Sequence, residues 1–367
     1  MSNLSGKKLV IACGGTGGHL FPGIAIAEAW RKRGGEVLLL ISEKQIDALA
    51  TEGFDHLHFE RMPAIAMPKK TSPKMFGFLS KFVKAFFKCK KLFKDYKADA
   101  VLGMGGFTST APLAAGKLLG KPTFIHEANA IPGRANLLNA KFADMVLVGF
   151  DFCAPRFEGS KTVVTGTPLR PSLIEKPTRE EALEFLGLHP DRKTIMIMGG
   201  SQGAVRINEL VAKSLPRFVE AGIQVLHITG PHDYEKMTEV FLANRQAGTV
   251  ADFLNEVQYA YAVADLAICR AGASSSVELA YYGVPAILIP YPYAADDHQT
   301  ANAAIFSAPG AAEMWKQSEL SEDTFADQII ELMDDSLRLA RMKATMQQLA
   351  RPDSSNDVCD AIATKLV

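Results

Sequence analysis

The first glycine-rich turn of this chain carries a side chain that can transfer a proton. The turn, GGTGGH at residues 14–19, follows the apolar run Leu9–Cys13 and opens a segment with helical spacing of apolar residues. Its glycines let backbone N–H groups approach a ligand, and the N-terminus of the following helix favours anions. His19 stands at the helix start, where catalytic groups gather in α/β folds, although a structural role is commoner for a lone histidine.

The same turn also allows a dinucleotide-binding interpretation. Gly15 and Gly17 fit the first two glycines of G-x-G-x-x-G, and Glu43 follows the second expected strand, where a ribose-binding acid would stand. The third glycine position holds Leu20 instead. A nicotinamide-dependent oxidoreductase therefore stays a minor alternative.

A second glycine-rich turn, GGSQGA at residues 199–204, again stands between an apolar run and a helical pattern. Its N–H groups and the Ser201 hydroxyl can hold a diphosphate. Because any tight turn between a strand and a helix can carry glycine, this turn alone is a weak signal.

The segment CRAGASSSVELA, residues 269–280, is predicted to place a small-residue loop after a strand and Glu278 in the first turn of the next helix. A carboxylate there often only stabilises the helix, by about 0.3–1 kcal/mol. A more specific role is to accept two hydrogen bonds from a ribose diol, as in nucleotide-binding folds.

A polar cluster follows in PYAADDHQTANA, residues 292–303. It offers donors and acceptors of the kind a sugar needs, on Asp297, His298, Gln299 and Asn302. The plainer interpretation is a helix capped by Asp296 or Asp297.

The Asp-X-Asp pair with which many sugar-nucleotide enzymes hold a divalent metal is absent from the chain. A leaving diphosphate would then be stabilised by helix N-termini, backbone N–H groups and Arg170. We therefore expect neither a metal nor a cofactor.

The elements that would position these residues alternate as strand, turn and helix through two successive halves, which indicates parallel sheets covered on both faces. Expected strands of the first half are Leu9–Cys13, Val37–Ile41, Ala100–Leu102, Thr123–His126 and Met145–Val148. Those of the second half are Thr194–Met198, Val225–Thr229, Leu266–Cys269 and Ala286–Pro290. Expected helices include Leu20–Arg33, Ala204–Ala221, Asp323–Leu349 and Asp357–Leu366.

Each half opens in the same way, with the glycine turns at Gly14 and Gly199, 185 residues apart. The predicted fold class is α/β, with two tandem Rossmann-like domains facing a cleft, where ligands bind beyond the carboxyl ends of the strands. The expected domains are an N-terminal domain over 1–165, a Pro-rich and charged linker over 166–192, a C-terminal domain over 193–350, and a C-terminal helix over 351–367 that packs back on the first domain.

The composition fits an ordinary globular protein. The 367 residues suit two domains, and equal numbers of Lys+Arg and Asp+Glu, 40 each, argue against a general nucleic-acid binder. Five scattered cysteines indicate reduced, buried thiols in a cytosolic protein. The apolar run at the N-terminus is too short for a signal peptide, and no apolar stretch reaches 18 residues.

One local charge asymmetry stands out, over residues 69–97. The stretch holds ten lysines against the single acid Asp95. Its helical spacing puts lysines on one face and apolar residues on another, which fits binding at an anionic lipid surface, worth about 1 kcal/mol per lysine. The alternative is a normal helix with a solvated basic face and a buried apolar face. The predicted membrane-facing residues are Phe76, Leu79, Phe82, Phe86, Lys81, Lys84 and Lys88.

Taken together and in order, the motifs resemble the MurG family of bacterial cell-wall N-acetylglucosamine (GlcNAc) transferases. The resemblance extends over nearly the whole chain and rests on GGTGGH, GMGGF (103–107), HEAN (126–129), GTPLR (166–170), GGSQGA, CRAGASSSVE (269–278) and DHQTANA (297–303). Each motif alone is weak, but the ordered set is specific. The departures are mild: Ala128, Thr167 and Leu254 stand where Gln, Asn and Ile are common in the family.

The resemblance implies two Rossmann-like domains in the GT-B arrangement, of which the domain over 1–165 faces the acceptor and the membrane and the domain over 193–350 binds the donor. It also implies a metal-independent, inverting hexosyltransferase. Its substrates would be UDP-GlcNAc and lipid I, the undecaprenyl-diphosphate-linked MurNAc-pentapeptide, and its product lipid II for peptidoglycan synthesis, made peripherally at the cytoplasmic face of the inner membrane. By position in the family's motifs, the implied donor-binding residues are Thr16, Gly17, Gly18, Asn129, Arg170, Ser201, Leu254, Ala273, Ser274, Ser275, Ser276, Val277, Glu278 and Gln299. The implied acceptor-binding residues are Gly14, Gly15, Gly105, Gly106 and Phe107.

Inversion by a single displacement needs a base that takes the proton of the acceptor hydroxyl, and His19 is the candidate. Its alternative role is to orient a phosphate. Two other activities remain open at this point: a glycolipid-forming transferase that uses UDP-galactose and diacylglycerol, and a UDP-GlcNAc epimerase.

Overall fold

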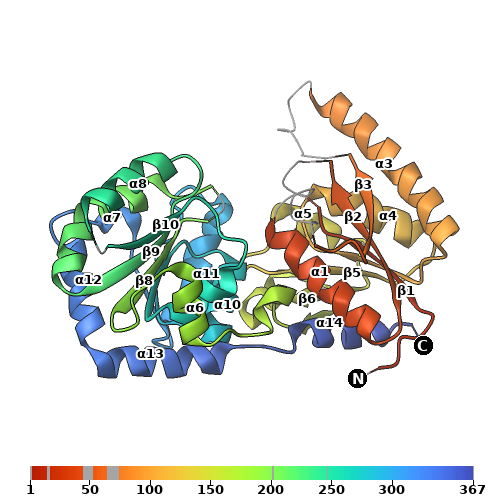
Figure 1. Ribbon diagram of the computed structural model, residues 1–367. Coiled ribbons are helices and arrows are strands. Elements are labelled where there is room, and N and C mark those ends of the chain that lie inside the picture. Colours follow the sequence, from red (N-terminus) through yellow and green to blue (C-terminus); the bar gives the residue numbers. More distant parts are fainter. Residues whose placement is uncertain are drawn as a thin grey trace. The chain divides into compact units, whose positions relative to one another are not determined.

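The computed structural model describes residues 2–14, 17–43, 53–63, 74–200, 202–245 and 247–366. Over them the chain is α/β and forms two compact units (Figure 1). The first unit comprises Met1–Pro171 and Arg351–Val367, and the second comprises Ser172–Ala350. Within the described ranges, none of the helices combines the length and the apolar character needed to cross a bilayer.

The first unit is built on a parallel sheet, which has seven strands among the described residues, in the order β3-β2-β1-β4-β5-β6-β7. The central strands β4, β5 and β6 are buried throughout, and β1 is buried except at Lys8, because helices cover both faces. Their bounds are β1 Lys8–Ala12, β2 Glu36–Ser42, β3 His58–Met62, β4 Ala100–Gly103, β5 Thr123–Glu127, β6 Met145–Val148 and β7 Thr162–Val164.

Two sets of helices cover this sheet. Successive residues of β1 point to opposite faces: Leu9 packs in one apolar cluster and Val10 in the other. The first cluster includes residues of α1 and α14, and the second includes residues of α3 and α4. The helices of this unit are α1 Gly17–Lys32, α3 Lys74–Tyr96, α4 Thr110–Leu118, α5 Arg134–Asn139 and α14 Ser354–Ala363, with short 3₁₀ turns at Phe107–Ser109 and Asp151–Arg156.

The second unit repeats the plan with a sheet in the order β10-β9-β8-β11-β12-β13, again parallel. Its strands are β8 Lys193–Met198, β9 Ile223–Ile228, β10 Gly248–Ala251, β11 Leu266–Cys269, β12 Ala286–Leu288 and β13 Ala312–Met314. Its helices are α6 Arg179–Leu186, α7 Val205–Glu220, α8 Tyr234–Ala243, α9 Val257–Val263, α10 Ala273–Tyr282, α11 His298–Ser307, α12 Phe325–Asp334 and α13 Ser336–Leu349. Further 3₁₀ turns lie at Pro171–Leu173, Ala295–Asp297 and Gln317–Glu319.

The stretch that the sequence suggested as a linker, 166–192, is folded over much of its length. The chain passes from the first unit to the second at Pro171 and Ser172. Helix α6 then starts with a capping box, in which the Thr178 hydroxyl accepts from Glu181 N and the Glu181 carboxylate accepts from Thr178 N. The helix buries Ala182, Leu183 and Leu186, so this part of the chain belongs to the second unit.

Near the end of the chain, α14 returns to the first unit and packs on α1. Val358, Cys359 and Ile362 are fully buried in the same cluster as Leu20 and Trp30. An ion pair at the edge of this contact joins Arg33 Nη1 to Asp360 Oδ1 at 2.7 Å, and it helps to hold the pKa of Asp360 at about 2 despite partial burial.

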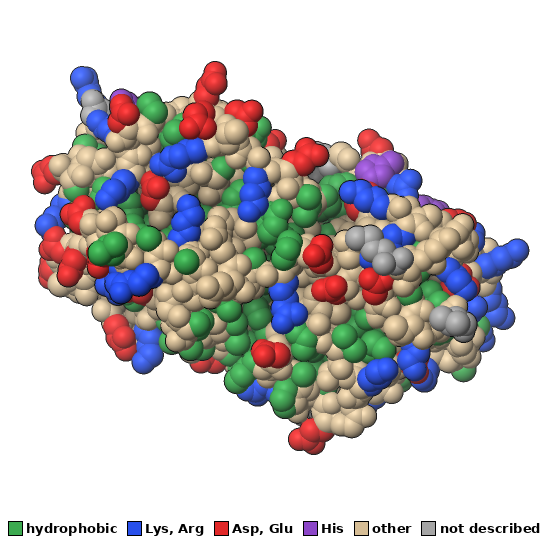
Figure 2. Space-filling view, turned by 90° about the horizontal axis from the view of Figure 1, so that it is seen from below, with side chains coloured by type: hydrophobic (Ala, Val, Ile, Leu, Met, Phe, Trp, Pro, Cys, Tyr) green, Lys and Arg blue, Asp and Glu red, His purple; other side chains and the backbone are tan. Residues whose placement is uncertain are grey.

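All five cysteines are free and buried, as the sequence indicated. Burial raises the pKa of the Cys89 and Cys269 thiols to about 12, so they are protonated at neutral pH. Acidic and basic side chains are interspersed over the face shown in Figure 2, which is consistent with the zero net charge.

Candidate active site

His19 lies in the first turn of α1, with its imidazole against the loop that follows β4. A Cβ added at Gly105 would come within 2.7 Å of His19 Nε2, and one at Gly106 within 3.7 Å of His19 Cε1. Both glycines have positive φ, 124° and 70°. Because only glycine allows this backbone and this approach, the structure brings the candidate base and two candidate acceptor residues together.

Side chains tie this loop to the first glycine turn. Thr108 Oγ1 donates to Gly14 O at 2.9 Å, and Ser109 Oγ lies 3.1 Å from Ala12 O and 2.7 Å from Gly105 O. Gly14 is itself confined, since a Cβ there would lie 2.2 Å from Ser42 N. These contacts join Gly14 and the loop after β4 at the carboxyl end of the central strands.

The Phe107 ring connects this edge to α3. It meets the ring of Phe78 edge to face, with the centroids 6.4 Å apart. Phe107 is thus positioned by Phe78 of α3, the helix that carries the basic stretch.

The HEAN segment is organised by Glu127, a buried carboxylate that the motif analysis had not singled out. Its oxygens accept hydrogen bonds from Asn129 N and Nδ2, Gly133 N and Asn136 Nδ2, at 2.9–3.0 Å. The signal for this role was in the sequence: an acid directly after an apolar strand needs partners if it is buried. Asn129, a candidate donor residue, is therefore positioned by Glu127.

The GTPLR segment packs beside HEAN in the same unit. His126 Nε2 donates to Gly166 O at 2.9 Å. Burial lowers the pKa of His126, and a positive charge on the nearby His19 lowers it further. Arg170 lies with its guanidinium carbon 4.9 Å from the centroid of the Phe21 ring on α1, close to His19 in the chain.

In the second unit, the GGSQGA turn is locked against the loop after β9. A Cβ at Gly203 would lie 2.0 Å from Thr229 O, and one at Gly230 would lie 2.4 Å from Gly203 N. Both residues have positive φ, 76° and 80°. The turn leads directly into α7, whose N-terminus lies at the carboxyl edge of the sheet. Three predicted site residues, Ser201 here and Gly15 and Thr16 in the first unit, lie outside the described residues.

Helix α10 begins at Ala273, so Glu278 lies in its second turn, not in the first turn that the sequence suggested. The first turn contains no acid, and helix-end stabilisation does not explain Glu278. The Glu278 carboxylate is buried and accepts a hydrogen bond from the Tyr261 hydroxyl at 2.7 Å. The other predicted residues, Ala273, Ser274, Ser275, Ser276 and Val277, form the N-terminal part of the helix, after β11.

The DDHQ segment is strained. Asp296 and Asp297 both have positive φ, 53° and 52°, a conformation that costs a non-glycine residue about 1–3 kcal/mol. Asp297 stands at the N-cap position of α11, but its side chain accepts from the Thr300 hydroxyl at 2.7 Å and makes no capping bond. The capping interpretation is therefore wrong for Asp297.

Two polar side chains tie this segment to its neighbours. Tyr291 N donates to Gln299 Oε1 at 2.9 Å, and Asn302 Nδ2 donates to Ala271 O at 3.0 Å. Arg270, which the sequence analysis had not selected, donates to Ile289 O and Pro290 O and joins the loops after β11 and β12. Leu254 lies half-buried in the loop after β10. Apart from Ser201, the candidate donor residues of this unit thus lie on loops and helices that follow the carboxyl ends of its strands.

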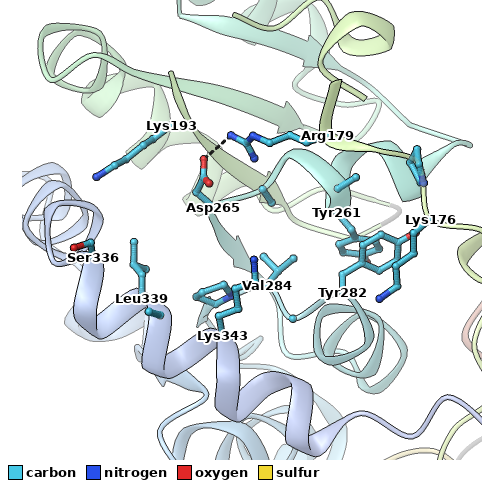
Figure 3. A pocket seen from close by; sticks show the side chains of 16 residues that line it. Lys176, Arg179, Lys193, Tyr261, Asp265, Tyr282, Val284, Ser336, Leu339 and Lys343 are labelled. Atoms are coloured by element: carbon cyan, nitrogen blue, oxygen red, sulfur yellow. Dashed lines mark hydrogen bonds and ion pairs between the residues drawn. The ribbon is translucent and has the colours of Figure 1, made fainter. Parts of the chain in front are cut away.

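A pocket of about 550 Å³ lies at the opposite edge of the same sheet (Figure 3). Lys193 begins β8 there, and Asp265 and Pro285 directly precede β11 and β12. Arg179 Nη2 pairs with Asp265 Oδ2 at 3.0 Å. The lining includes none of the predicted site residues, but Tyr261, the partner of Glu278, forms part of it.

Helix α3 carries two apolar stripes. Phe82 and Phe86, predicted to face a membrane, are partly buried against the core of the first unit, next to the buried Phe93. The exposed stripe is made of Phe76, Leu79, Val83 and Phe87, with Phe76 83% and Phe87 61% exposed. Lys81, Lys84 and Lys88 are all exposed, and Lys88 also donates to Arg61 O at 2.6 Å. The helical spacing in the sequence did not show which apolar residues of α3 pack on the core and which are exposed.

Among the described residues, no group of three His, Cys, Asp or Glu side chains could hold a metal ion.

Comparison with known proteins gives consistent matches along the chain. Residues 9–148 match the glycosyltransferase family 28 N-terminal domain, and residues 194–358 match the glycosyltransferase family 28 C-terminal domain. A protein of Halothermothrix orenii named UDP-N-acetylglucosamine–N-acetylmuramyl-(pentapeptide) pyrophosphoryl-undecaprenol N-acetylglucosamine transferase is 37% identical over 97% of this chain and 98% of its own. The protein of the same name from Geobacter sulfurreducens is 38% identical over 96% and 97%. The crystal structure of Acinetobacter baumannii MurG superposes with a TM-score of 0.77 at 29% identity, covering 98% of this chain and 99% of that one.

Proposed function

Because the chain belongs to glycosyltransferase family 28, and within it to the UDP-N-acetylglucosamine–N-acetylmuramyl-(pentapeptide) pyrophosphoryl-undecaprenol N-acetylglucosamine transferases, we propose the following reaction. The enzyme moves GlcNAc from UDP-GlcNAc to the 4-hydroxyl of MurNAc in lipid I, which gives lipid II and UDP. The β-1,4 bond forms with inversion at the anomeric carbon. This assignment replaces the glycolipid-forming and epimerase alternatives, because the identity extends over the whole chain.

The observation that carries the mechanism is the packing of His19 on Gly105 and Gly106. The glycine loops hold the acceptor diphosphate through backbone N–H groups. The His19 imidazole takes the proton of the acceptor hydroxyl while that oxygen bonds to the anomeric carbon and the bond to UDP breaks. Since positive charge develops on the sugar as its bond to UDP breaks, the base need act only in the transition state.

The donor is bound by the second unit. The GGSQGA turn and the N-terminus of α10 stabilise the diphosphate of UDP. Glu278 accepts the ribose hydroxyls, Leu254 meets uracil through its backbone, and Gln299 contributes to binding the sugar. This set explains why the polar residues of the unit gather at the carboxyl edge of its sheet.

The exposed stripe of α3 docks the enzyme at the cytoplasmic face of the inner membrane. Phe76, Leu79, Val83 and Phe87 enter the headgroup region, and Lys81 and Lys84 contact anionic lipid. This peripheral position suits a lipid-linked acceptor.

The test is an assay with radiolabelled UDP-GlcNAc and a short-chain lipid I analogue, with a chelator present and a control that lacks acceptor. We expect labelled disaccharide-lipid only with acceptor, and in the presence of the chelator. Consumption of the donor without acceptor would instead indicate an epimerase. Product with diacylglycerol and UDP-galactose, but not with lipid I, would indicate the glycolipid-forming reaction.

A further inference from the structure

Glu278, the candidate ribose-binding residue, accepts a buried hydrogen bond from a side chain that has no role in the reaction proposed above. The Tyr261 hydroxyl, on α9, donates to Glu278 Oε2, on α10, at 2.7 Å. Both residues are only 2% exposed. Tyr261 belongs to none of the motifs that carry the family resemblance.

We propose that Tyr261 is a positioning residue, which fixes the Glu278 carboxylate in the orientation that accepts both ribose hydroxyls of a uridine nucleotide. The inference rests on the proposed ribose role of Glu278. It assigns Tyr261 a part in selecting a ribonucleotide without contact to the nucleotide.

The physical reason lies in the needs of a buried carboxylate. A hydrogen bond from a neutral hydroxyl to an ionised oxygen is short and about twice as strong as a neutral pair. A carboxylate accepts about four hydrogen bonds, so the Tyr261 bond is compatible with two further bonds from a ribose diol. Without the hydroxyl, Glu278 Oε2 would face the edge of an aromatic ring, and the carboxylate would turn toward other donors.

Tyr261 is itself held in place by an aromatic cluster. Its ring lies 5.3 Å from the ring of Tyr282, whose hydroxyl donates to Leu173 O at 3.3 Å. The Lys176 ammonium lies 4.8 Å from the centroid of the Tyr282 ring. Figure 3 shows Tyr261, Tyr282 and Lys176 beside one another on one wall of the pocket. The direction of the Tyr261 hydroxyl is therefore set by packing, which preorganises Glu278 before the nucleotide arrives.

The experiment measures binding of UDP and of 2′-deoxy-UDP by calorimetry to the full-length chain. Tyr261→Phe removes only the hydroxyl and keeps the ring against Tyr282. We expect about tenfold weaker UDP binding, little change for 2′-deoxy-UDP, and hence a smaller preference between them. Tyr282→Phe is the matched control, because it removes the neighbouring hydroxyl in the same cluster; it should leave the preference unchanged.

Three further variants separate the possible outcomes. Glu278→Ala should weaken UDP binding, and adding Tyr261→Phe to it should have no further effect. Glu278→Asp keeps the charge but withdraws the carboxylate from Tyr261, so it should also reduce the preference, and it provides the test if Tyr261→Phe does not fold.

Normal UDP binding in Glu278→Ala would overturn the ribose role and the inference with it. Weak binding in Glu278→Ala with normal binding and preference in Tyr261→Phe would overturn the inference alone. Equal weakening of both nucleotides by Tyr261→Phe, with a lower melting temperature, would indicate a merely structural residue and would also overturn it.

Discussion

At the scale of the residue, the contact between His19 and Gly105 makes a direct prediction. Gly105→Ala adds a methyl group that would lie 2.7 Å from His19 Nε2, on a backbone with φ of 124°. We expect turnover to fall at least tenfold, because the imidazole must move from its place. Gly120→Ala is the control: Gly120 also has positive φ, 68°, but a Cβ there meets nothing within 4 Å. Equal losses in the two variants would show that backbone strain, not His19, is responsible.

The proposed base gives a second prediction. His19→Ala should lower kcat by about 10²–10⁴ while leaving UDP binding nearly unchanged, since the base acts in the transition state. His58→Ala, at an exposed histidine at the start of β3, should be close to wild type. Saturating lipid I analogue and UDP-GlcNAc are needed for the comparison. Near-normal turnover of His19→Ala would contradict the assignment.

A third residue makes stability depend on pH. His227 is fully buried, and its Nε2 donates to Asn208 Oδ1 at 2.9 Å. Burial lowers its pKa from 6.5 to about 3. The unfolded chain therefore binds a proton that the folded chain does not, so stability is complete above the unfolded pKa and is lost as the pH falls toward the folded pKa.

At about pH 5, which is about 1.5 units below the pKa of 6.5 in the unfolded chain, the free energy of unfolding should be lower by about 2 kcal/mol, at about 1.4 kcal/mol per pH unit. His227→Gln keeps an amide donor for Asn208 but cannot titrate. Urea unfolding at about pH 7.5 and about pH 5 should show the wild type losing about 2 kcal/mol more than the variant. Parallel pH dependence in the two proteins would contradict the prediction.

At the scale of the element, the exposed stripe of α3 can be tested apart from the core stripe. Phe76→Ser with Phe87→Ser should strongly weaken binding to vesicles that contain anionic lipid, and Lys81→Gln with Lys84→Gln should weaken it by about 1 kcal/mol per lysine at low salt. Phe82→Ser, in the partly buried stripe, should mainly lower stability. Matched controls in the second unit are Leu242→Ser, at an exposed apolar residue, and Lys236→Gln. Vesicle binding unaffected by all α3 variants would contradict the membrane proposal.

The elements that the sequence predicted, and those it missed, differ for a physical reason. Every central strand was expected within two residues of its observed bounds, because these strands are continuous apolar runs buried on both faces. The four that were missed, β3, β7, β10 and β13, are the four sheet edges. Edge strands are partly exposed, as the burial of β7 and β10 illustrates, so they carry no continuous apolar run to detect.

The candidate site shows the same limit. Glycine motifs indicated which loops follow the carboxyl ends of the strands, and the structure places Gly105 of one such loop against His19. Glu127 and Tyr261 were not foreseen as partners of site residues, because their hydrogen bonds depend on how neighbouring elements pack. Spacing along one chain segment carries no information about such contacts.

At the scale of the whole molecule, the two units should respond separately to core mutations. Ile362→Ala in α14 and Ile329→Ala in α12 each truncate a fully buried isoleucine, and each should cost about 2–5 kcal/mol. Because Ile362 lies in the core of the first unit and Ile329 in the core of the second, each variant should shift a different unfolding transition. Hydrogen exchange resolved by peptide would assign the transitions. A shift of the same transition by both variants would show that the units unfold as one.

The return of the chain to the first unit also sets an order of events during translation. Domains usually fold from the N-terminus as they are synthesised. Here residues 351–363 are made only after the whole of the second unit, yet they close the apolar cluster beneath α1. On the ribosome, the second unit can thus be finished while the first unit still lacks part of its core, so the part made first is the part completed last.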